Sequence, residues 1–312
     1  MKIAFHTSTE QYCGIAEVSR RLIEHLKKYV EIEVVPISQN VSFDSQKKLA
    51  GKLNQADIVH IQHNHSFWGK NYLSSSLWFG YLRSLIFKPT IISLHAIWPP
   101  PSLASMKHKW INKFGIYNFM NNLTFKKNTF FIVHSEFHRE TLIQRGIKPN
   151  MVFTIPFGIP EPRIVTEEEK SKFIKKWSLE NKKIIGIPGS ISKYKNYDLV
   201  VNALSKLPNE VVAIFAGGVR TKEEEEYFLY FKGLIEKLNL HNRVIVTGAL
   251  KEDEMAVSLS VFDLCVVPYS DEISLSYSVN LCISYHKPTI VSDTETFKRI
   301  NRKYDCFELF AR

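Results

Sequence analysis

The sequence predicts an α/β protein with two Rossmann-like, doubly wound domains, and three observations lead to this prediction. Short apolar runs of the kind that form buried parallel strands recur along the whole chain. Segments with helical spacing of apolar residues separate these runs, which is the order expected of strand–helix–strand units. The 312 residues, 45% of them hydrophobic, are enough for about two domains with a core each.

The first half of the chain has the pattern of one such domain. Strands are expected at 2–6, 31–37, 58–61, 90–94, 130–133 and 152–155. Helices are expected at 16–29, 46–54 and 136–144, where apolar residues recur every three or four positions. The short connections between the first elements indicate a right-handed strand–helix–strand unit, in which ligands bind beyond the carboxyl ends of the strands.

A change of composition separates the two halves. Three prolines and a glycine between residues 156 and 162 are typical of a linker. We therefore expect an N-terminal domain at 1–165 and a C-terminal domain at 166–312, joined by a helix at 166–177. In the second domain, strands are expected at 184–187, 211–216, 243–247, 264–267 and 289–291. Helices are expected at 197–206, 223–238, 252–260 and from about residue 276.

The stretch from Asp263 to Asp293 has the layout of an anion-binding site. A buried strand ends at Pro268, a polar loop follows, and Ser276 and Ser278 stand at the start of a helical pattern. Free backbone N–H groups and the positive end of the helix dipole attract anions at such a helix start. This stretch is the feature around which we organise the functional prediction.

A second stretch points to the same chemistry. Gly189 follows the predicted strand at 184–187 and allows a tight turn, and Lys193 and Lys195 come next, ahead of a helix. Two lysines on a strand-to-helix turn suit a diphosphate. Two solvated lysines on an ordinary loop are the alternative that this local pattern leaves open.

Together these segments resemble a GT-B glycosyltransferase of the retaining, family-four type. That family reads G-R-x-x-x-x-K-G at 189–196, D-x-x-x-x-P at 263–268 and G-K-P-V-V-A-S-D at 286–293. In the first half, Cys13–Ala16 resembles its glycine-rich first loop, and 56–60 its A-D-V-V-H strand. The segments 91–95, 132–135 and 155–158 resemble T-x-H-D, V-x-x-S and I-P-x-G. These pieces stand in the family's order.

The resemblance implies transfer of a sugar from a nucleotide-diphosphate donor to an acceptor hydroxyl, without a metal or another cofactor. Lys195, supported by Lys193, would neutralise the leaving diphosphate, and His95 would contact the sugar as the second catalytic residue. Gly14 would let the backbone approach the donor. Gly189, Ser190 and the N–H groups near Ser276 and Ser278 would bind the phosphates.

Several positions depart from the family pattern. Counting back from Pro288, the two usual glutamates fall at Ile273 and Leu281, although Glu272 and Asn280 lie one residue earlier and keep the spacing. Ser274, Ser276 and Ser278 match a serine-bearing variant of the same segment. Ser190 stands where the family has its phosphate-binding arginine. Family members usually extend further, so the second domain is expected to be incomplete at its C-terminus.

These departures keep two other functions open. The chain could be a catalytically silent GT-B-like binding subunit that needs a partner, or a sugar-nucleotide epimerase of the same architecture. Nucleotide release from a nucleotide sugar would separate an enzyme from the silent subunit.

Composition limits the location and the cofactors. Cys13, Cys265, Cys282 and Cys306 have no metal or redox spacing and indicate a reducing compartment. The run HIQHNH at 60–65 invites a metal hypothesis, but no further ligand lies near it in sequence, so we favour polar residues that line a cleft. No signal peptide or membrane-spanning run is apparent, which predicts a cytoplasmic protein.

The excess of positive over negative charge lies in the first half of the chain. The net charge is +10, and no acidic residue occurs between Asp57 and Glu136. The stretches 67–88 and 106–127 in this half are basic and rich in aromatic residues. They fit an anionic membrane surface, or an amphipathic helix packed on its own sheet. No nucleic-acid-binding motif accompanies them, so we expect no nucleic-acid partner. A lipid-linked or sugar acceptor, in cell-surface polysaccharide or glycolipid synthesis on the inner face of the membrane, would suit this surface.

Overall fold

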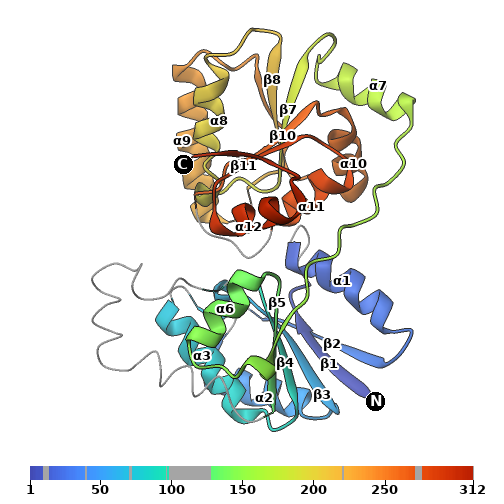
Figure 1. Cartoon of the computed structure of the whole chain (residues 1–312), viewed down its shortest axis with the longest axis vertical. Helices are drawn as coiled ribbons and strands as arrows, with labels where there is room; N and C mark the ends of the chain where they lie inside the picture. The colour runs from blue at the N-terminus through green and yellow to red at the C-terminus, as the bar shows by residue number, and fades with distance from the viewer. Residues whose placement is uncertain are drawn as a thin grey trace. The chain divides into compact units, whose positions relative to one another are not determined.

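A computed structural model describes residues 1–9, 14–38, 41–69, 72–95, 97, 128–219, 221–270 and 276–311. The chain forms two compact units, Met1–Phe157 and Gly158–Arg312 (Figure 1). Each unit holds one six-stranded sheet with helices on it, and every strand pair described is parallel. The predicted fold class of two doubly wound parallel sheets is therefore confirmed.

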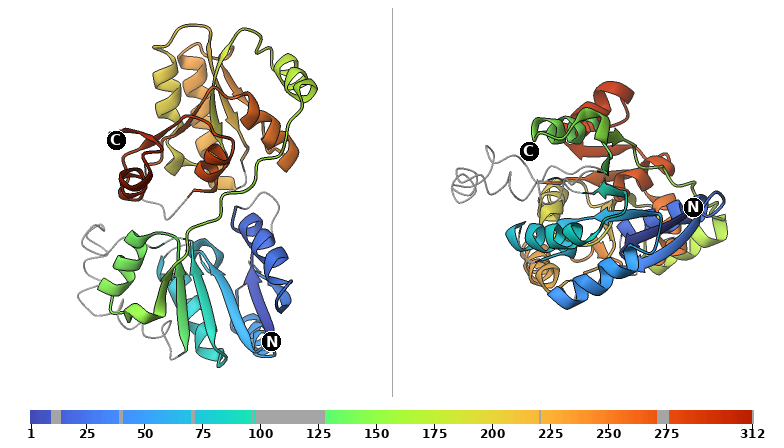
Figure 2. Two further views of the ribbon diagram at one scale, coloured as in Figure 1. Left: turned by 45° about the vertical axis from the view of Figure 1, so that its right-hand side comes forward. Right: turned by 90° about the horizontal axis from the view of Figure 1, so that it is seen from below.

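The sheet of the first unit has the order β2-β1-β3-β4-β5-β6 (Figure 2). Its strands are β1 (Lys2–Thr7), β2 (Glu31–Pro36), β3 (Ile58–His63), β4 (Thr90–Leu94), β5 (Thr129–Val133) and β6 (Val152–Thr154). Gln62 of β3 pairs with Ser93 of β4 in the parallel register. The carboxyl ends of β3 and β4 therefore lie beside each other at one edge of the sheet.

The helices of this unit are α1 (Gly14–Leu26), α2 (Phe43–Leu53), α3 (Tyr72–Leu85) and α6 (Glu136–Gln144), with the 3₁₀ turns η1 (His65–Phe67) and η3 (Pro149–Met151). Helix α2 begins three residues before the predicted start because Ser42 caps it. The Ser42 hydroxyl accepts a hydrogen bond from the Ser45 N–H, and the Ser45 hydroxyl accepts one from the Ser42 N–H.

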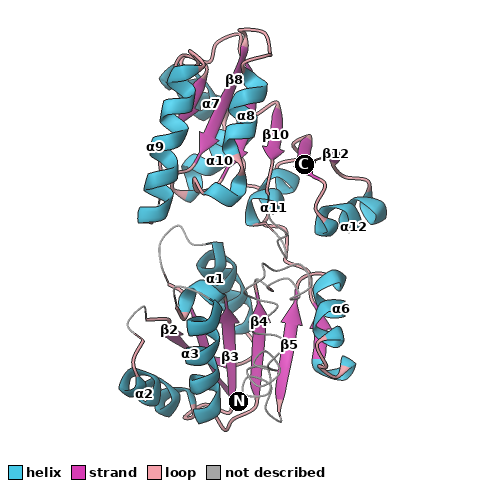
Figure 3. Cartoon of the chain, turned by 90° about the vertical axis from the view of Figure 1, so that its left-hand side faces the viewer, coloured by secondary structure: helices cyan, strands magenta, loops and turns pink. Residues whose placement is uncertain are grey.

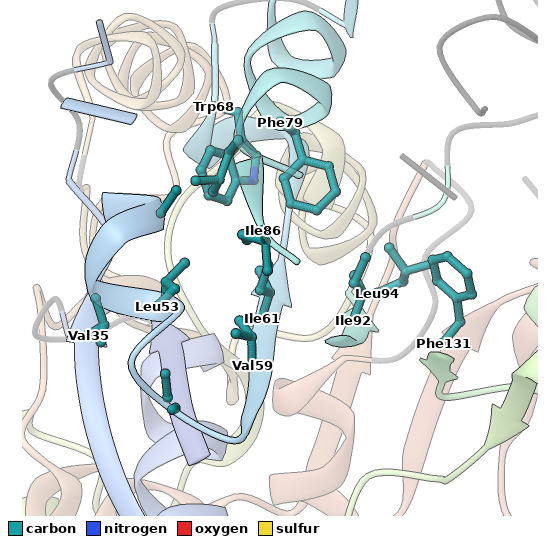
Figure 4. Packing of buried hydrophobic residues seen from close by; sticks show 14 of the residues in the cluster. Val35, Leu53, Val59, Ile61, Trp68, Phe79, Ile86, Ile92, Leu94 and Phe131 are labelled. Atoms are coloured by element: carbon teal, nitrogen blue, oxygen red, sulfur yellow. The ribbon is translucent and has the colours of Figure 1, made fainter. Parts of the chain in front are cut away.

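The core of the first unit lies between the sheet and helices α2 and α3 (Figure 4). Val59 and Ile61 of β3 are completely buried, and the ring of Trp68 lies 5.1 Å from that of Phe79 of α3. Burial of each such side chain contributes roughly 1.5–3 kcal/mol to folding. This packing fixes the positions of β3 and β4, and with them the polar residues at the carboxyl ends of these strands.

The sheet of the second unit has the order β12-β11-β10-β7-β8-β9 (Figure 3). Its strands are β7 (Lys183–Pro188), β8 (Val211–Ala216), β9 (Val244–Val246), β10 (Leu264–Val267), β11 (Thr289–Ser292) and β12 (Glu308–Phe310). Its helices are α7 (Glu167–Lys176), α8 (Tyr197–Leu204), α9 (Lys222–Lys237), α10 (Glu252–Val261), α11 (Tyr277–Ser284) and α12 (Glu295–Tyr304), with the 3₁₀ turn η4 (Lys193–Lys195).

Strand β10 is the direct neighbour of β7, with Leu264 opposite Ile185. The loops that follow these two strands therefore leave the sheet side by side, and they carry the two stretches that the sequence singled out. Helix α12 and strand β12 were not expected from the sequence, and β12 supplies the sixth strand of this sheet. No helix in the described ranges combines the length and the apolar character needed to cross a bilayer.

Candidate functional site

Gly189 lies at the centre of the candidate anion site in the second unit. It follows β7 directly, and its φ of +112° is a conformation that residues with a side chain rarely adopt. A methyl group added to its Cα would lie 2.7 Å from Lys195 Nζ and 2.7 Å from Ser278 Oγ. The lysine ammonium and the serine hydroxyl thus lie over the same glycine, at most twice that distance apart.

Lys195 is buried, with only 5% of its surface exposed. Its Nζ lies 3.3 Å from the Ser190 hydroxyl and 5.9 Å from the centre of the Tyr194 ring. Turn η4 directs this side chain inward, whereas Lys193 at the start of the same turn is exposed. The structure therefore separates the two predicted lysines, and Lys195 alone lies beside Gly189 and Ser278.

Two contacts hold η4 in place. The Ser192 hydroxyl donates a short hydrogen bond to the buried carboxylate of Glu224 on α9. The Tyr197 hydroxyl donates to the backbone carbonyls of Gly189 and Ser190, at 3.3 and 3.1 Å. The turn that carries Lys195 is thereby tied to two helices.

The amino end of α11 forms the other side of this site. Ser276 caps the helix by accepting a hydrogen bond from the Val279 N–H at 3.4 Å, and its hydroxyl lies 2.7 Å from the Tyr269 hydroxyl. Ser278 stands in the first turn and is buried. The backbone N–H groups at a helix start, together with the helix dipole, favour an anion next to Lys195. Glu272 and Ser274 lie outside the described residues.

The loop after β7 and the loop after β10 are fastened to each other. The N–H and the hydroxyl of Ser270 both donate to the Tyr194 carbonyl, at 2.8 and 3.0 Å. The rings of Tyr194 and Tyr269 meet edge to face at 5.6 Å, and the Ser292 hydroxyl donates to the Tyr269 carbonyl. The two halves of the anion site are thus preorganised by the protein.

Gly217 packs closely against the backbone of the same loop. A methyl group on it would lie 2.1 Å from the Gly189 carbonyl oxygen, so only glycine permits β8 to pass this close. The pair Gly217–Gly218 therefore packs against the loop after β7.

Position 280 and its neighbour show what replaces the family glutamate. Asn280 is buried within α11, and its Nδ2 has no hydrogen-bond partner among the described residues. Leu281 packs against the hydrophobic core of the second unit. Asn280, one residue before the position counted from Pro288, thus places a buried polar side chain in this helix.

The first unit holds a second group of predicted residues at the carboxyl ends of β3 and β4. His95 Nε2 lies 2.6 Å from Gln62 Oε1, and Gln62 Nε2 lies 3.2 Å from His60 Nε2. The His60 ring nitrogen also lies 2.8 Å from the Ser93 hydroxyl. His60, Gln62 and His63 are buried residues of β3, so the strand continues two residues beyond its predicted end at 61.

Burial lowers the pKa of these histidines. The pKa of His60 falls to about 4, and that of His95 lies well below its usual range, because the protein interior disfavours the charged imidazolium. The His95 ring stacks on Phe157 at 5.4 Å, and the His134 ring stacks on the same phenylalanine at 3.8 Å. At neutral pH, His95 is thus a neutral, fixed ring with one donor and one acceptor nitrogen.

Gly14, Ile15 and Ala16 are the first residues of α1, whereas Cys13 of the predicted glycine-rich loop lies outside the described residues. Within the part of the chain that the structure describes, no three His, Cys, Asp or Glu side chains are grouped as a bound metal requires.

The match to a known protein family falls within the second unit. The family of glycosyl transferases group 1 matches residues 169–310. No curated protein sequence matches the chain.

Solved structures match the whole chain at low identity. HepE from Anabaena, in complex with UDP and glucose, superposes with a TM-score of 0.73 at 16% identity, over 100% of this chain and 86% of HepE. Sucrose-phosphate synthase from Thermosynechococcus elongatus gives a TM-score of 0.70 at 14% identity, over 100% and 86%. WaaG, a glycosyltransferase of lipopolysaccharide biosynthesis, gives 0.71 at 12% identity, over 99% and 86%.

Proposed function

The chain has the GT-B fold and its second unit carries a glycosyl transferases group 1 domain, and on this basis we propose that it transfers a hexose from a nucleotide-diphosphate donor to an acceptor hydroxyl. The observation that carries the proposal is the convergence of Lys195 Nζ and Ser278 Oγ over Gly189. HepE was solved with UDP and with UDP-glucose, which makes a UDP-sugar the first donor to test.

The donor diphosphate is proposed to bind between Lys195 and the amino end of α11. Negative charge grows on the diphosphate as the bond to the sugar breaks, and an ammonium group already in place stabilises that charge without reorganisation. Because Ser190 stands where the family has an arginine, this site has one positive group where the family has two. Lys195 therefore contributes a larger share of the charge stabilisation. Ser276, Ser278 and Asn280 complete the polar wall.

The transfer is proposed to retain the anomeric configuration and to need no metal, as the resemblance to the family implies. In such a front-face reaction, the acceptor oxygen forms its bond to the anomeric carbon on the side from which the diphosphate leaves. The acceptor proton passes to the departing phosphate oxygen. His95 is proposed to position the sugar by a hydrogen bond to one of its hydroxyl groups.

The acceptor is proposed to be lipid-linked and to reach the protein at an anionic membrane. Phe43, Trp78 and Tyr81 form what we call the α2–α3 aromatic surface, in which the Phe43 ring lies 5.0 Å from Trp78 and 5.1 Å from Tyr81. Phe43 is 62% exposed, and Lys47 and Lys48 of the same helix are exposed too. Trp78 and Tyr81 are half-buried, and an exposed ring such as Phe43 beside lysines suits a headgroup layer. The stretch 106–127 lies outside the described residues.

A catalytically silent binding subunit is the second candidate function. Leu281, at one counted glutamate position, packs into the core, and Ser190 replaces the arginine. Such a subunit would still bind the nucleotide, so binding alone does not separate the two candidates.

Slow hydrolysis of the donor tests the proposal. The purified chain would be incubated with a panel of UDP-, GDP- and ADP-sugars, and the released nucleoside diphosphate would be measured. We expect release from one or a few donors at a rate well above that of buffer. Binding of a nucleotide without release from any donor would instead assign the silent subunit.

A further inference from the structure

The side chain of Gln62 lies between two histidines, His60 of β3 and His95, which follows β4. Its Oε1 lies 2.6 Å from His95 Nε2 and its Nε2 lies 3.2 Å from His60 Nε2. The backbone holds the same residues in register, because the His95 N–H donates to the His63 carbonyl at 3.0 Å. Gln62 is 2% exposed, so water does not replace either contact.

The oxygen and the nitrogen of the Gln62 amide have different hydrogen-bonding roles, and these roles select the tautomers of the two histidine rings. The amide oxygen only accepts hydrogen bonds and the amide nitrogen only donates them. In this orientation of the Gln62 amide, His95 carries its proton on Nε2, while His60 presents a lone pair at Nε2 and carries its proton on Nδ1. One glutamine side chain thus selects opposite tautomers for two neighbouring histidines.

We propose that Gln62 is a positioning residue that locks His95 as the Nε2–H tautomer and so makes His95 Nδ1 a hydrogen-bond acceptor for a sugar hydroxyl. This inference rests on the proposed function, since it assigns the direction of the sugar contact made by His95. The stacking of His95 on Phe157, at 5.4 Å and 21° between the planes, fixes the plane of the ring. Gln62 then decides which nitrogen is the acceptor.

The burial of the rings gives the amide this control. A charged imidazolium carries protons on both nitrogens and would make the tautomer irrelevant, but desolvation keeps His95 and His60 neutral at pH 7. A neutral imidazole ring has one proton on its two nitrogens, and a hydrogen bond to the Gln62 oxygen stabilises that proton on Nε2.

Nitrogen-15 NMR of the ring nitrogens in the full chain at pH 7 tests the assignment. We expect His95 to show a protonated Nε2 and an unprotonated Nδ1, and His60 to show the reverse. The opposite tautomer of His95 in the wild-type chain would overturn the proposal. This readout needs no catalytic activity, so a correct tautomer without donor hydrolysis would fail the proposed function and leave the role of Gln62 intact.

Two variants separate positioning from packing. Gln62→Met keeps the length of the side chain and removes both polar contacts, so His95 should lose its tautomer preference and donor hydrolysis should fall about tenfold. Gln62→Glu retains an accepting oxygen but adds a buried negative charge beside His95, which favours the doubly protonated imidazolium, so Nδ1 should become a donor and the hydrolysis lost in Gln62→Met should not recover. A His95 tautomer unchanged in Gln62→Met would contradict the proposal.

Ser93→Ala is the matched control for both variants. It removes the hydroxyl next to His60 and leaves the Gln62–His95 contact in place. We expect the His95 tautomer to stay on Nε2–H in this variant. A loss of that tautomer in Ser93→Ala would assign control to the wider network and would refute the specific role of Gln62.

Discussion

Lys195 and Ser278 come from segments separated by most of the second domain, yet Lys195 Nζ and Ser278 Oγ both lie 2.7 Å from the point where a Cβ on Gly189 would stand. The convergence follows from the sheet order, because β10 pairs with β7 and the loops after both strands leave the sheet together. The fastening of the loops through Ser270 and Tyr194 makes this geometry a property of the protein itself.

Substitution of Gly189 should remove nucleotide binding. In Gly189→Ala, the methyl group would occupy the space beside Lys195 Nζ and Ser278 Oγ, and φ of +112° would add strain of about 1 kcal/mol or more. We expect UDP affinity to fall at least tenfold and the urea midpoint to decrease. Calorimetric titration and urea unfolding measure the two effects.

Gly233→Ala is the matched control for this prediction. Gly233 lies inside α9, and a methyl group there would meet no atom within 4 Å. Alanine in a helix interior is favoured over glycine by about 0.5–1 kcal/mol, so the variant should be slightly more stable and should bind UDP normally. Equal loss of binding in both variants would refute the local argument.

His286 offers a stability prediction at the other end of α11. It has φ of +52° at the position after the helix cap, where glycine is the usual residue, and its side chain is exposed. His286→Gly should relieve about 1 kcal/mol of backbone strain and raise the urea midpoint. His241→Gly, at an exposed histidine outside the left-handed region, should not raise it. A lower midpoint for His286→Gly would contradict the assignment.

Mild acid should destabilise the first unit selectively. His6, His60 and His134 are buried, and the folded chain lowers the pKa of each from 6.5 to about 4. Between these values the unfolded chain binds more protons, so stability is retained above pH 6.5 and falls as the pH decreases toward 4. Each such histidine contributes up to about 1.4 kcal/mol per pH unit.

Hydrogen exchange at pH 7 and pH 5, corrected for intrinsic rates, measures this effect. Peptides from β3 and β4 should lose protection at pH 5, whereas peptides from β7 and β8 serve as the internal reference, because the second unit has only the exposed His241 and His286. An equal loss of protection in both units would refute the prediction.

The α2–α3 aromatic surface should bind anionic vesicles. The full chain should sediment with vesicles rich in an anionic phospholipid at low salt, and less of it should sediment at high salt, because ions screen the lysines. Phe43→Ala with Trp78→Ala should reduce the bound fraction several-fold. Tyr230→Ala, at an exposed ring on α9, is the control and should bind like the wild type. No sedimentation at low salt would remove the membrane proposal.

The sequence predicted the parallel sheets because buried strands stand out as continuous apolar runs. Thr90–Leu94, Val211–Ala216 and Leu264–Val267 are strands with the predicted bounds. Strand β12 was missed because its three residues carry too few apolar side chains to form such a run. Helix α12 was missed as well, since its polar sequence buries little besides Phe297.

The candidate site was predicted in outline and not in its details. Neighbouring strands explain why the stretches at 189–196 and 276–280 meet. The inward direction of Lys195 and the outward direction of Lys193 depend on the tight turn η4 and on Asn196 at φ of +55°, which no periodicity reveals. The polar residues Gln62 and His63 led us to end the strand at 61, whereas hydrogen bonding allows the Gln62 side chain to lie buried beside His60 in β3.

The central claim is that Lys195 binds the donor diphosphate at the amino end of α11, and calorimetric titration of UDP tests it most directly. Lys195→Ala should weaken binding by about a hundredfold, close to the 2.7–4 kcal/mol that one preorganised electrostatic group contributes. Lys193→Ala, at the exposed lysine of the same turn, should bind UDP like the wild type. Equal affinities for the wild type and Lys195→Ala, with both chains folded, would contradict the account.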